Sequence, residues 1–503
     1  MLDRALLAVI LSAASVGSIG ASAAEPSAPG VAEAATGEWG PVIPFPVLPI
    51  HAHLLPDGRV LFWDRHDTPE EDGHPRTWDP ESGLFTLDAE PVKGHDLFCS
   101  GHAFLEDGSL LAAGGHFGFE LGQPYAATYE PASAHWSAAP AMNAGRWYPS
   151  VLTLADGSAL VLSGTDEIAV PNPLPQIFEP ASRTWRDLAG ATLALPFYPM
   201  AFLAPQGDVV VAGPEATARR LTTTGPGVWS DLASALNGGR RAGSAVLYGP
   251  GRILVAGGGA TPKASAEIID VAAESPAFRE VGSMAHARRH LDLTLLPDGS
   301  VLAIGGTSLP ENDARGAVLA TELWSPRSET WTTLAPMSVP RLYHSIALLL
   351  PDGRVLAAGG GHPSDVEHGD PDHFDGQIFS PPYLFRGARP TIVAAPASVA
   401  LGEAFVVEAG PESVSERVTW VRLGSVTHSF NMNQRFLELD STATANGRRV
   451  VAPSATRLAP PGHYLMFLLD GKGVPSRGRV VQLRGGIFSD GFERGSFAAW
   501  TNP

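Results

Sequence analysis

The chain carries a recurring pattern in which a short apolar run leads into a glycine turn and a second apolar run ends in small residues. Clear copies begin at Leu54, Leu105, Leu154 and Leu349, and weaker copies begin at Ala204, Tyr248 and Leu295. The turn glycines are Gly58, Gly108, Gly157, Gly207, Gly251, Gly299 and Gly353. Two apolar runs around a glycine turn are typical of a β-hairpin. The pattern therefore predicts seven copies of one β-rich unit.

The spacing of these copies indicates a repeat architecture. Successive turn glycines are 50, 49, 50, 44, 48 and 54 residues apart, and several copies are followed by an E-P-x-x-x-x-W-like strand with Trp136, Trp185 or Trp331. This period matches kelch repeats. Each repeat is a four-stranded blade, and radial packing covers the faces that one blade alone leaves exposed. We predict a seven-bladed kelch β-propeller over residues 25–386; an array of sandwiched sheets is the alternative, but it requires no such regular period.

The period is lost near residues 387–390, where Gly-Ala-Arg-Pro interrupts the chain. Alternating segments then appear at 405–407, 418–421 and 464–468. Such segments are typical of half-buried strands, so we predict an immunoglobulin-like (early set) β-sandwich over residues 387–485. Residues 486–503 are expected to form a short exposed tail.

The first residues have the pattern of an export signal. Arg4 precedes an apolar stretch at 5–16, and small residues follow at 21–24. We predict a signal peptide over residues 1–24 and a secreted protein, extracellular or periplasmic. A membrane anchor is the alternative, although the apolar stretch is short for a bilayer span.

Composition and charge restrict the function classes. The chain has 503 residues, 55 Gly, 45 Pro and 44% hydrophobic residues, which favours an all-β protein of more than one domain. With 34 Lys and Arg against 52 Asp and Glu, the net charge is −18. This field repels polyanions, so we expect no nucleic acid and no membrane among the partners.

Unusual side chains recur at one position of the repeat. Cys99, Tyr148 and His344 each lie nine residues before a turn glycine, and Tyr343 precedes His344. Equivalent positions of a rotational repeat lie on one ring, so these side chains are expected to converge at one mouth of the channel. The same count on weaker copies makes Tyr198 and His290 pocket candidates. The alternative is that large polar side chains simply plug the channel.

Cys99 is the single cysteine of the chain. An intramolecular disulfide is therefore impossible, and an unpaired thiol is unusual in an exported protein of this size. A buried, inert thiol is the plain alternative.

Several motifs resemble the signature regions of the glyoxal oxidase and galactose oxidase family of copper-radical oxidases, in order over about residues 50–483. They are HDLFC at 95–99, RWYPS at 146–150, RLYHS at 341–345, HFDGQIF at 373–379, VTH at 426–428 with NQR at 433–435, and GVPS at 473–476.

The resemblance implies a ligand set and a cofactor. It makes His344 and His428 the imidazole ligands of one copper ion, Tyr148 the equatorial phenolate and Tyr343 the axial phenol. It also implies a thioether between Cys99 and the Tyr148 ring, which would give the single cysteine a role. Imidazole and phenolate suit a tetragonal Cu(II) site with an open position. Because His428 belongs to the second domain, a loop of that domain is expected to reach the channel.

The implied activity is oxidation of a small aldehyde or primary alcohol by O2, with release of H2O2. Tyr343 would act as the general base and the Tyr148 radical would take a hydrogen atom. The chain has Pro199 where galactose oxidase carries a sugar-binding arginine, and Asp166 near the position of its stacking tryptophan. These departures favour glyoxal-oxidase-like substrates over galactose and predict a less shielded radical.

The remaining predictions concern other histidines and other functions. We expect structural or pocket roles for His51, His53, His286, His362, His368 and His373. The competing function is a non-catalytic kelch and immunoglobulin-like module that binds glycans or proteins. We find no G-x-S-x-G elbow or H-E-x-x-H helix of a hydrolase. We expect a monomer.

Overall fold

The computed structural model describes residues 32–65, 74–88, 91–362, 368–411 and 415–485. The predicted signal peptide (1–24) and tail (486–503) lie outside these ranges. Within them, one short α-helix, α1 (Glu33–Thr36), and two 3₁₀ helices, η1 (Ala314–Gly316) and η2 (Pro382–Phe385), accompany strands. No helix in the described ranges is long and apolar enough to cross a bilayer. The predicted all-β class is confirmed.

Each turn glycine joins the first two strands of its own sheet, and we number these sheets as blades 1 to 7 in chain order. The seven glycines have φ between 70° and 98°, a region that favours glycine. The repeat is therefore a repeat of one hairpin, because each copy needs the same left-handed turn.

The blades have the following strands. Blade 1 has β3 (His51–Leu54), β4 (Val60–Trp63), β5 (Arg76–Trp78) and β6 (Phe85–Leu87); blade 2 has β7 (Gly101–Phe104), β8 (Leu110–Ala113), β11 (Ala126–Glu130) and β12 (His135–Ala139). Blade 3 has β13 (Ser150–Thr153), β14 (Ala159–Leu162), β15 (Gln176–Glu179) and β16 (Thr184–Asp187); blade 4 has β17 (Ala201–Leu203), β18 (Val209–Val211), β19 (Thr217–Thr222) and β20 (Val228–Ser234). Blade 5 has β21 (Ser244–Gly249), β22 (Arg252–Ala256), β23 (Ala266–Asp270) and β24 (Phe278–Val281); blade 6 has β25 (Asp292–Leu295), β26 (Val301–Ile304), β27 (Ala320–Ser325) and β28 (Thr330–Pro336). Blade 7 has β29 (Ser345–Leu349), β30 (Val355–Gly359) and β31 (Asp375–Ser380), and a small separate sheet pairs β9 (His116–Gly118) with β10 (Leu121–Gly122).

The first strands of neighbouring blades pack against one another and close a ring. Strand β7 contacts β13, β25 contacts β29, and β29 contacts β3, so blade 7 meets blade 1. Two N-terminal strands, β1 (Glu38–Trp39) and β2 (Ile43–Pro44), pair antiparallel with β31 and complete the outer side of blade 7. Strands β3, β7, β13 and β29 are buried at every position. The burial of every position, polar ones such as His51 and His102 included, follows from packing on both faces.

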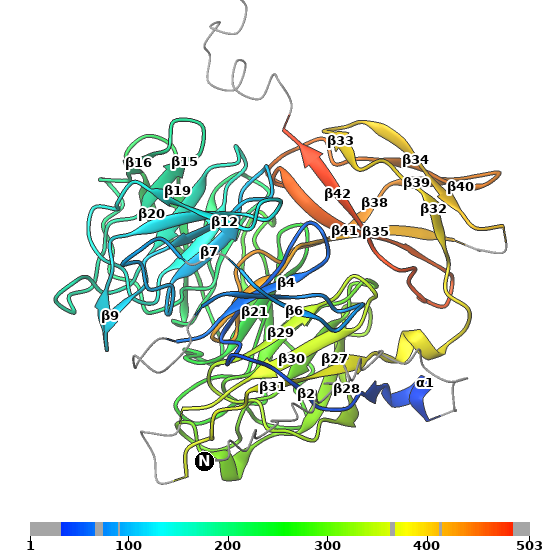
Figure 1. Ribbon diagram of the computed structural model, residues 1–503, viewed down its shortest axis with the longest axis horizontal. Coiled ribbons are helices and arrows are strands. Elements are labelled where there is room, and N and C mark those ends of the chain that lie inside the picture. Colours follow the sequence, from blue (N-terminus) through cyan, green and yellow to red (C-terminus); the bar gives the residue numbers. More distant parts are fainter. Residues whose placement is uncertain (1–31, 66–73, 89–90, 363–367, 412–414, 486–503) are drawn as a thin grey trace, which may run out of the picture.

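The C-terminal strands form two further sheets, drawn in gold to red in Figure 1. One sheet has the order β32 (Ile392–Ala394), β34 (Ala404–Ala409), β40 (Gly447–Val451), β39 (Ser441–Thr444); the other has β33 (Ser398–Ala400), β42 (Arg479–Arg484), β41 (Gly462–Leu469), β35 (Arg417–Arg422), β38 (Phe436–Leu439). Trp420, Val407 and Leu468 share one core between them. Buried and exposed positions alternate along β34, as expected for a strand with one face on that core.

One hairpin of the C-terminal region joins a propeller sheet. Strands β36 (Ser425–Thr427) and β37 (Phe430–Asn431) extend blade 1, because β36 pairs with β3 and sets Thr427 opposite His51. The two-residue turn consists of His428 and Ser429, with φ of 47° and 69°. Two positive φ values match a type I′ turn, which usually employs Asn or Gly. The hairpin thus holds a histidine in an unfavourable conformation at its tip, a feature that concentrates at functional sites.

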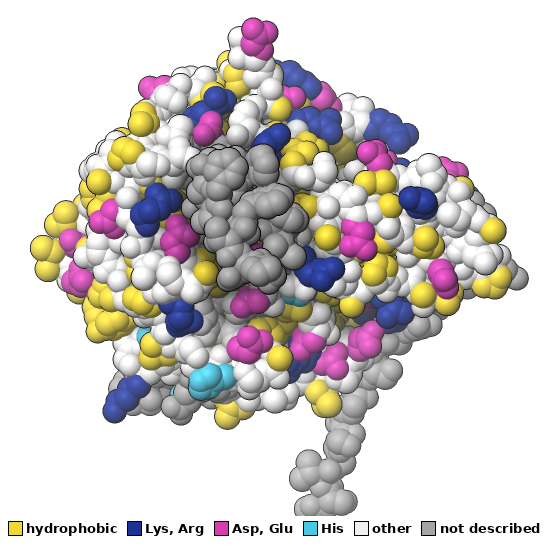
Figure 2. Space-filling model, turned by 90° about the horizontal axis from the view of Figure 1, so that it is seen from above, with side chains coloured by type: hydrophobic (Ala, Val, Ile, Leu, Met, Phe, Trp, Pro, Cys, Tyr) yellow, Lys and Arg dark blue, Asp and Glu magenta, His cyan; other side chains and the backbone are white. Residues whose placement is uncertain are grey.

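On the face shown in Figure 2, acidic and basic side chains are interspersed. This face therefore shows no patch made of one sign of charge alone.

Candidate metal centre

The residue nine positions before the turn glycine has a positive φ in six of the seven blades. These residues are Cys99 (62°), Tyr148 (64°), Tyr198 (44°), Ala242 (56°), His290 (59°) and His344 (68°). Backbone N–H groups link them from blade to blade: Tyr148 donates to the Cys99 carbonyl (3.0 Å), and Tyr198 donates to the Tyr148 carbonyl (3.0 Å). Non-glycine residues rarely adopt this conformation. The nine-residue count therefore reflects one backbone feature, and it holds for the weaker copies that carry Tyr198 and His290.

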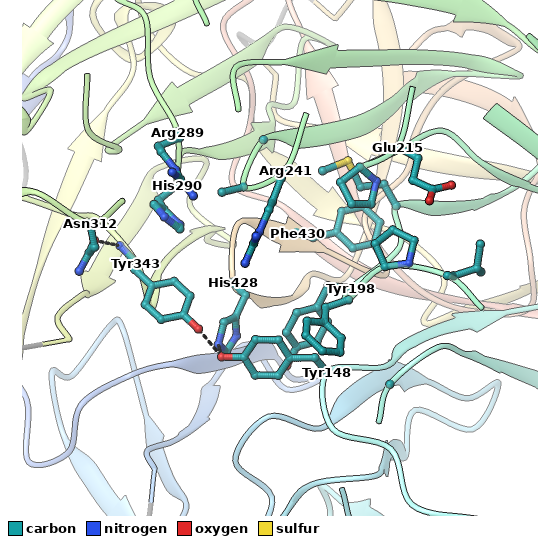
Figure 3. A pocket seen from close by; sticks show the side chains of 18 of the residues that line it. Tyr148, Tyr198, Glu215, Arg241, Arg289, His290, Asn312, Tyr343, His428 and Phe430 are labelled. Atoms are coloured by element: carbon teal, nitrogen blue, oxygen red, sulfur yellow. Dashed lines mark hydrogen bonds between the residues drawn. The ribbon is translucent and has the colours of Figure 1, made fainter. Parts of the chain in front are cut away.

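Four candidate ligands from three distant segments of the chain meet at this ring. The Nε2 atom of His428 lies 2.9 Å from the hydroxyl oxygen of Tyr148, which is also hydrogen bonded to the Tyr343 hydroxyl (Figure 3). The His344 ring centroid lies 4.8 Å from that of His428 and 3.9 Å from that of Tyr343. Two imidazoles and two phenols therefore surround one small space.

Hydrogen bonds set which nitrogen of each histidine faces that space. His344 Nδ1 lies 3.0 Å from the Gly361 carbonyl oxygen and must donate to it, so Nε2 keeps its lone pair. The Thr427 hydroxyl donates to the Ile50 carbonyl (2.9 Å) and therefore accepts from His428 Nδ1 (2.6 Å). Both Nε2 atoms are thus prepared as acceptors or metal ligands, with the opposite nitrogen fixed as metal-binding histidines require.

The site suits a metal cation that prefers imidazole nitrogen and phenolate oxygen as ligands. His344 Nε2 is buried and has no hydrogen-bond partner among the described residues. Burial first, and His428 second, hold the pKa of His344 well below its ordinary value, whereas burial raises the pKa of Tyr148 well above its own. These groups are therefore neutral in the protein alone, and a bound cation would favour the phenolate. Two imidazoles and two phenols match the ligand preferences of Cu(II).

This composition differs from the commoner metal sites. In the part of the chain that the structure describes, no three or more His, Cys, Asp or Glu side chains form a group that could hold a metal ion. The candidate set reaches four ligands only because tyrosine supplies two of them.

Cys99 is buried in the same apolar cluster as Tyr148. Its N–H donates to His51 Nε2 (3.2 Å), His51 Nδ1 donates to His102 Nε2 (3.1 Å), and His102 Nδ1 donates to the Ser425 hydroxyl (2.7 Å). Together with the Tyr148 N–H on the Cys99 carbonyl, this relay holds the cysteine backbone at both ends. His51 thus has a structural role, because it holds the Cys99 backbone in place. His53 Nδ1 also contacts the Ser425 hydroxyl (2.9 Å).

The expectation that the Tyr148 ring is poorly shielded was wrong. Trp147 stacks on it, with ring centroids 3.7 Å apart and planes 9° apart, and its Nε1–H donates to His116 Nδ1 (3.2 Å). Asp166 instead accepts the N–H groups of a local turn. The two stacked rings belong to consecutive residues, and the second of them, Tyr148, has a positive φ. Tyr343 and His344 stack in the same way, and this pattern was the signal that sequence reasoning missed.

The open side of the site is a cavity of about 960 Å³. Tyr148, Tyr343 and His428 line it together with the two pocket candidates, Tyr198 and His290. Cys99 and His344 lie outside this lining. Sequence reasoning also missed part of the wall, namely Phe197, Arg241, Arg289, Asn312 and Phe430.

The other histidines lie around the site or outside it. His362 lines the cavity, with its ring centroid 5.7 Å from that of Tyr343. His373 Nε2 lies 2.9 Å from an Asp370 carboxylate oxygen, and His286 and His368 are exposed.

Comparisons with known proteins agree with this geometry. The model of the glyoxal oxidase N-terminus matches residues 256–383, and the model of the galactose oxidase-like early set domain matches residues 389–483. A galactose oxidase from Gibberella zeae is 30% identical over 89% of this chain and 70% of its own length. The aldehyde oxidase GLOX1 from Arabidopsis thaliana is 35% identical over 40% of this chain and 36% of its own length.

Among solved structures, the chain is similar to a fungal alcohol oxidase of the AA5 family in complex with copper. The TM-score is 0.80 at 25% identity, covering 89% of this chain and 99% of the other.

Proposed function

Since this chain belongs to the galactose oxidase and glyoxal oxidase family of copper-radical oxidases, we propose that it oxidises small aldehydes, as their hydrates, or primary alcohols. The proposed acceptor is O2 and the proposed product is H2O2. The resemblance supports a secreted enzyme in which one copper ion and a Cys99–Tyr148 thioether radical form the cofactor.

The observation that carries this proposal is the meeting of four ligand atoms. The rings of His344 and His428 lie beside the hydroxyl groups of Tyr148 and Tyr343, and three of these residues, Tyr148, Tyr343 and His428, line the cavity. Copper bound there would supply one-electron chemistry and an electrophilic position for the substrate oxygen. The role of the chain is to position these groups and to control access.

Tyr343 and Tyr148 divide the removal of two hydrogens from the substrate. Tyr343 accepts the proton of the substrate hydroxyl as a general base. A Tyr148 radical would take a hydrogen atom from the adjacent carbon, and copper held by His344, His428, Tyr148 and Tyr343 would supply the one-electron chemistry that completes the oxidation. Dioxygen takes up two electrons and two protons and leaves as H2O2, so that each turnover balances.

Cys99 and Trp147 adjust the Tyr148 ring. Formation of the thioether removes the S–H hydrogen of Cys99 and one ring hydrogen of Tyr148, with dioxygen as the oxidant. Sulfur substitution makes the ring easier to oxidise. The stacked indole of Trp147 covers one face of the ring and limits its contact with water.

One residue, between the cavity-lining Tyr198 and Met200, supports small substrates over galactose. Pro199 is buried and offers no side-chain donor where galactose oxidase has a sugar-binding arginine. Loss of that planar set of donors removes directional contacts to sugar hydroxyls.

The test is peroxide release by the copper-loaded protein across aldehydes, primary alcohols and sugars. We expect release with small aldehydes or alcohols and none from Tyr148→Phe, which keeps the ring but loses the hydroxyl. Trp185→Phe, on the outer strand β16, is the matched aromatic control. A copper-loaded protein that releases no peroxide with any compound of the panel would contradict the proposal.

A further inference from the structure

Two arginines occupy equivalent positions on the cavity wall. Arg241 and Arg289 each lie ten residues before the turn glycine of blades 5 and 6, the position that Phe197 occupies in blade 4 and Tyr343 in blade 7. All four side chains line the cavity. In Figure 3 the Arg241 side chain extends toward His428, and Arg289 lies beside His290.

The arginines just before them in the sequence have a structural role. Arg240 binds the Gly257 carbonyl (2.9 Å) and the Glu267 carboxylate (2.6 Å). Arg288 binds the Gly305 carbonyl (3.0 Å) and the Glu322 carboxylate (2.6 Å) in the same manner. These guanidinium groups hold each blade together, and their charges are paired within the protein.

Arg241 and Arg289 differ from their neighbours because their side chains make no hydrogen bond or ion pair with any described residue. Arg289 is only 6% exposed, and its Nε atom is buried without a partner. Its two terminal nitrogens are not buried in this way, and the residue lines the cavity, so these nitrogens are accessible from it. A guanidinium group held in a buried position without an anion is costly.

The charges near this pair leave it available. Glu311 lines the cavity and acts electrostatically on Arg289, but no ion pair joins the two among the described residues. Glu215, also on the wall, is paired with Arg219. Arg289 lies beside His290 on the same wall, as Figure 3 shows.

We propose that Arg241 and Arg289 bind an oxyanion, a carboxylate or a phosphate, carried by the substrate itself. This inference rests on the proposed function, since it names the class of aldehyde or alcohol that the oxidase takes. The His290 ring centroid lies 5.1 Å from that of Tyr343, so the anion site and the proposed general base share one wall. Guanidinium groups match both oxyanions through paired N–H donors.

The aromatic part of the cavity wall fits the uncharged body of such a substrate. Phe197 packs edge-on against Tyr148, with ring centroids 5.6 Å apart, and Phe430 completes an apolar wall. A substrate would thus present its oxidised carbon to Tyr148 and Tyr343 and its anion to blades 5 and 6. In a chain of net charge −18, a local cationic pair offsets the average repulsion that an anion meets.

The kinetic test compares matched substrates with the copper-loaded protein. The pairs are benzyl alcohol with 4-(hydroxymethyl)benzoate, and glycolaldehyde with glycolaldehyde phosphate. The pair with the larger preference for its anionic member shows whether the site favours a carboxylate or a phosphate. We expect kcat/KM to favour the anionic member at least tenfold, with the preference falling as salt is added. In Arg241→Gln and Arg289→Gln this ratio should fall by roughly 10- to 100-fold, as for loss of a charge-assisted hydrogen bond, and Lys variants should retain part of it. Arg279→Gln, on the outer strand of blade 5, removes an exposed charge and should leave the ratio unchanged.

A binding measurement separates this inference from the proposed function. Titration calorimetry with benzoate on the copper-free protein should show binding that the Arg241→Gln/Arg289→Gln variant loses. If the wild type binds benzoate and the double variant does not, but the copper-loaded wild type oxidises no compound, the anion site stands and the oxidase activity is overturned. Equal kcat/KM for neutral and anionic substrates, or benzoate binding unaffected by the double substitution, would overturn the anion site.

Discussion

The Nε2 atom of His428 lies 2.9 Å from the Tyr148 hydroxyl oxygen, although the two residues are 280 positions apart in the chain. Tyr148 precedes the first strand of blade 3, whereas His428 sits at the tip of a hairpin that leaves the C-terminal sheets to pair with blade 1. The candidate metal centre is therefore complete only when both parts of the chain are folded together.

Replacing His428 by glycine should remove the metal without unfolding the protein. Glycine adopts the φ of 47° at this turn without strain, so the free energy of unfolding should change by at most about 1 kcal/mol. Copper affinity should fall by at least about 100-fold, because one of two imidazole ligands is lost. The measurements are copper titration and thermal unfolding, with the exposed His286→Gly as control. Undiminished copper affinity in His428→Gly would show that His428 is not a ligand.

Replacing Cys99 by alanine should separate copper binding from turnover. Two imidazoles and two phenols remain, so copper should still bind, but an unsubstituted phenol is harder to oxidise and turnover should fall by orders of magnitude. Loss of this buried thiol should destabilise the fold by on the order of 1 kcal/mol. Steady-state peroxide release and chemical unfolding check the two parts, and wild-type turnover by Cys99→Ala would contradict the role given to sulfur.

Replacing Trp147 by leucine should shorten the lifetime of the oxidised cofactor. The indole lies 3.7 Å from the Tyr148 ring, centroid to centroid, and its removal opens that face to water. The expected result is faster decay of the radical absorption, with an intermediate rate for Trp147→Phe, which keeps a smaller ring. Trp185→Leu, on an outer strand, should decay at the wild-type rate. If Trp147→Leu decays as slowly as wild type, the stack does not protect the radical.

The stability of the fold should fall in mild acid because of buried neutral histidines. Burial lowers the pKa of His95 to about 4, although its ring bonds the Gly114 carbonyl (2.8 Å). The unfolded chain takes up this proton near pH 6.5, so the contribution is complete above that pH and is lost as the pH falls toward 4. His95 alone accounts for about 3 kcal/mol over this window. Unfolding free energies measured at pH 7, 5.5 and 4.5 should fall less steeply in His95→Gln; equal slopes would contradict this assignment.

Much of the fold was predictable because one backbone requirement recurs. Gly58 and its six counterparts repeat because each hairpin needs a left-handed turn. Cys99 and Tyr148 lie nine residues before that turn, at a second position of the repeat where φ is positive. A count of residues was therefore enough to place both residues on one ring.

Other features needed the three-dimensional structure. The pairing of β36 with β3 joins strands more than 370 positions apart, and no local pattern encodes it. The stack of Trp147 on Tyr148 joins consecutive residues, and a family comparison at Asp166 does not reveal it. The unpaired state of Arg241 could be seen only after the partners of Arg240 were known.

The central claim is a covalent bond between Cys99 and Tyr148, and peptide mass spectrometry of the copper-treated protein tests it most directly. We expect a peptide containing Cys99 joined to one containing Tyr148, about two hydrogen masses below their sum and resistant to thiol reductants. Cys99→Ala should yield only the separate Tyr148 peptide. Two separate peptides from the copper-treated wild type, with Cys99 open to alkylation, would contradict the radical cofactor and favour a propeller that binds its ligands without oxidising them.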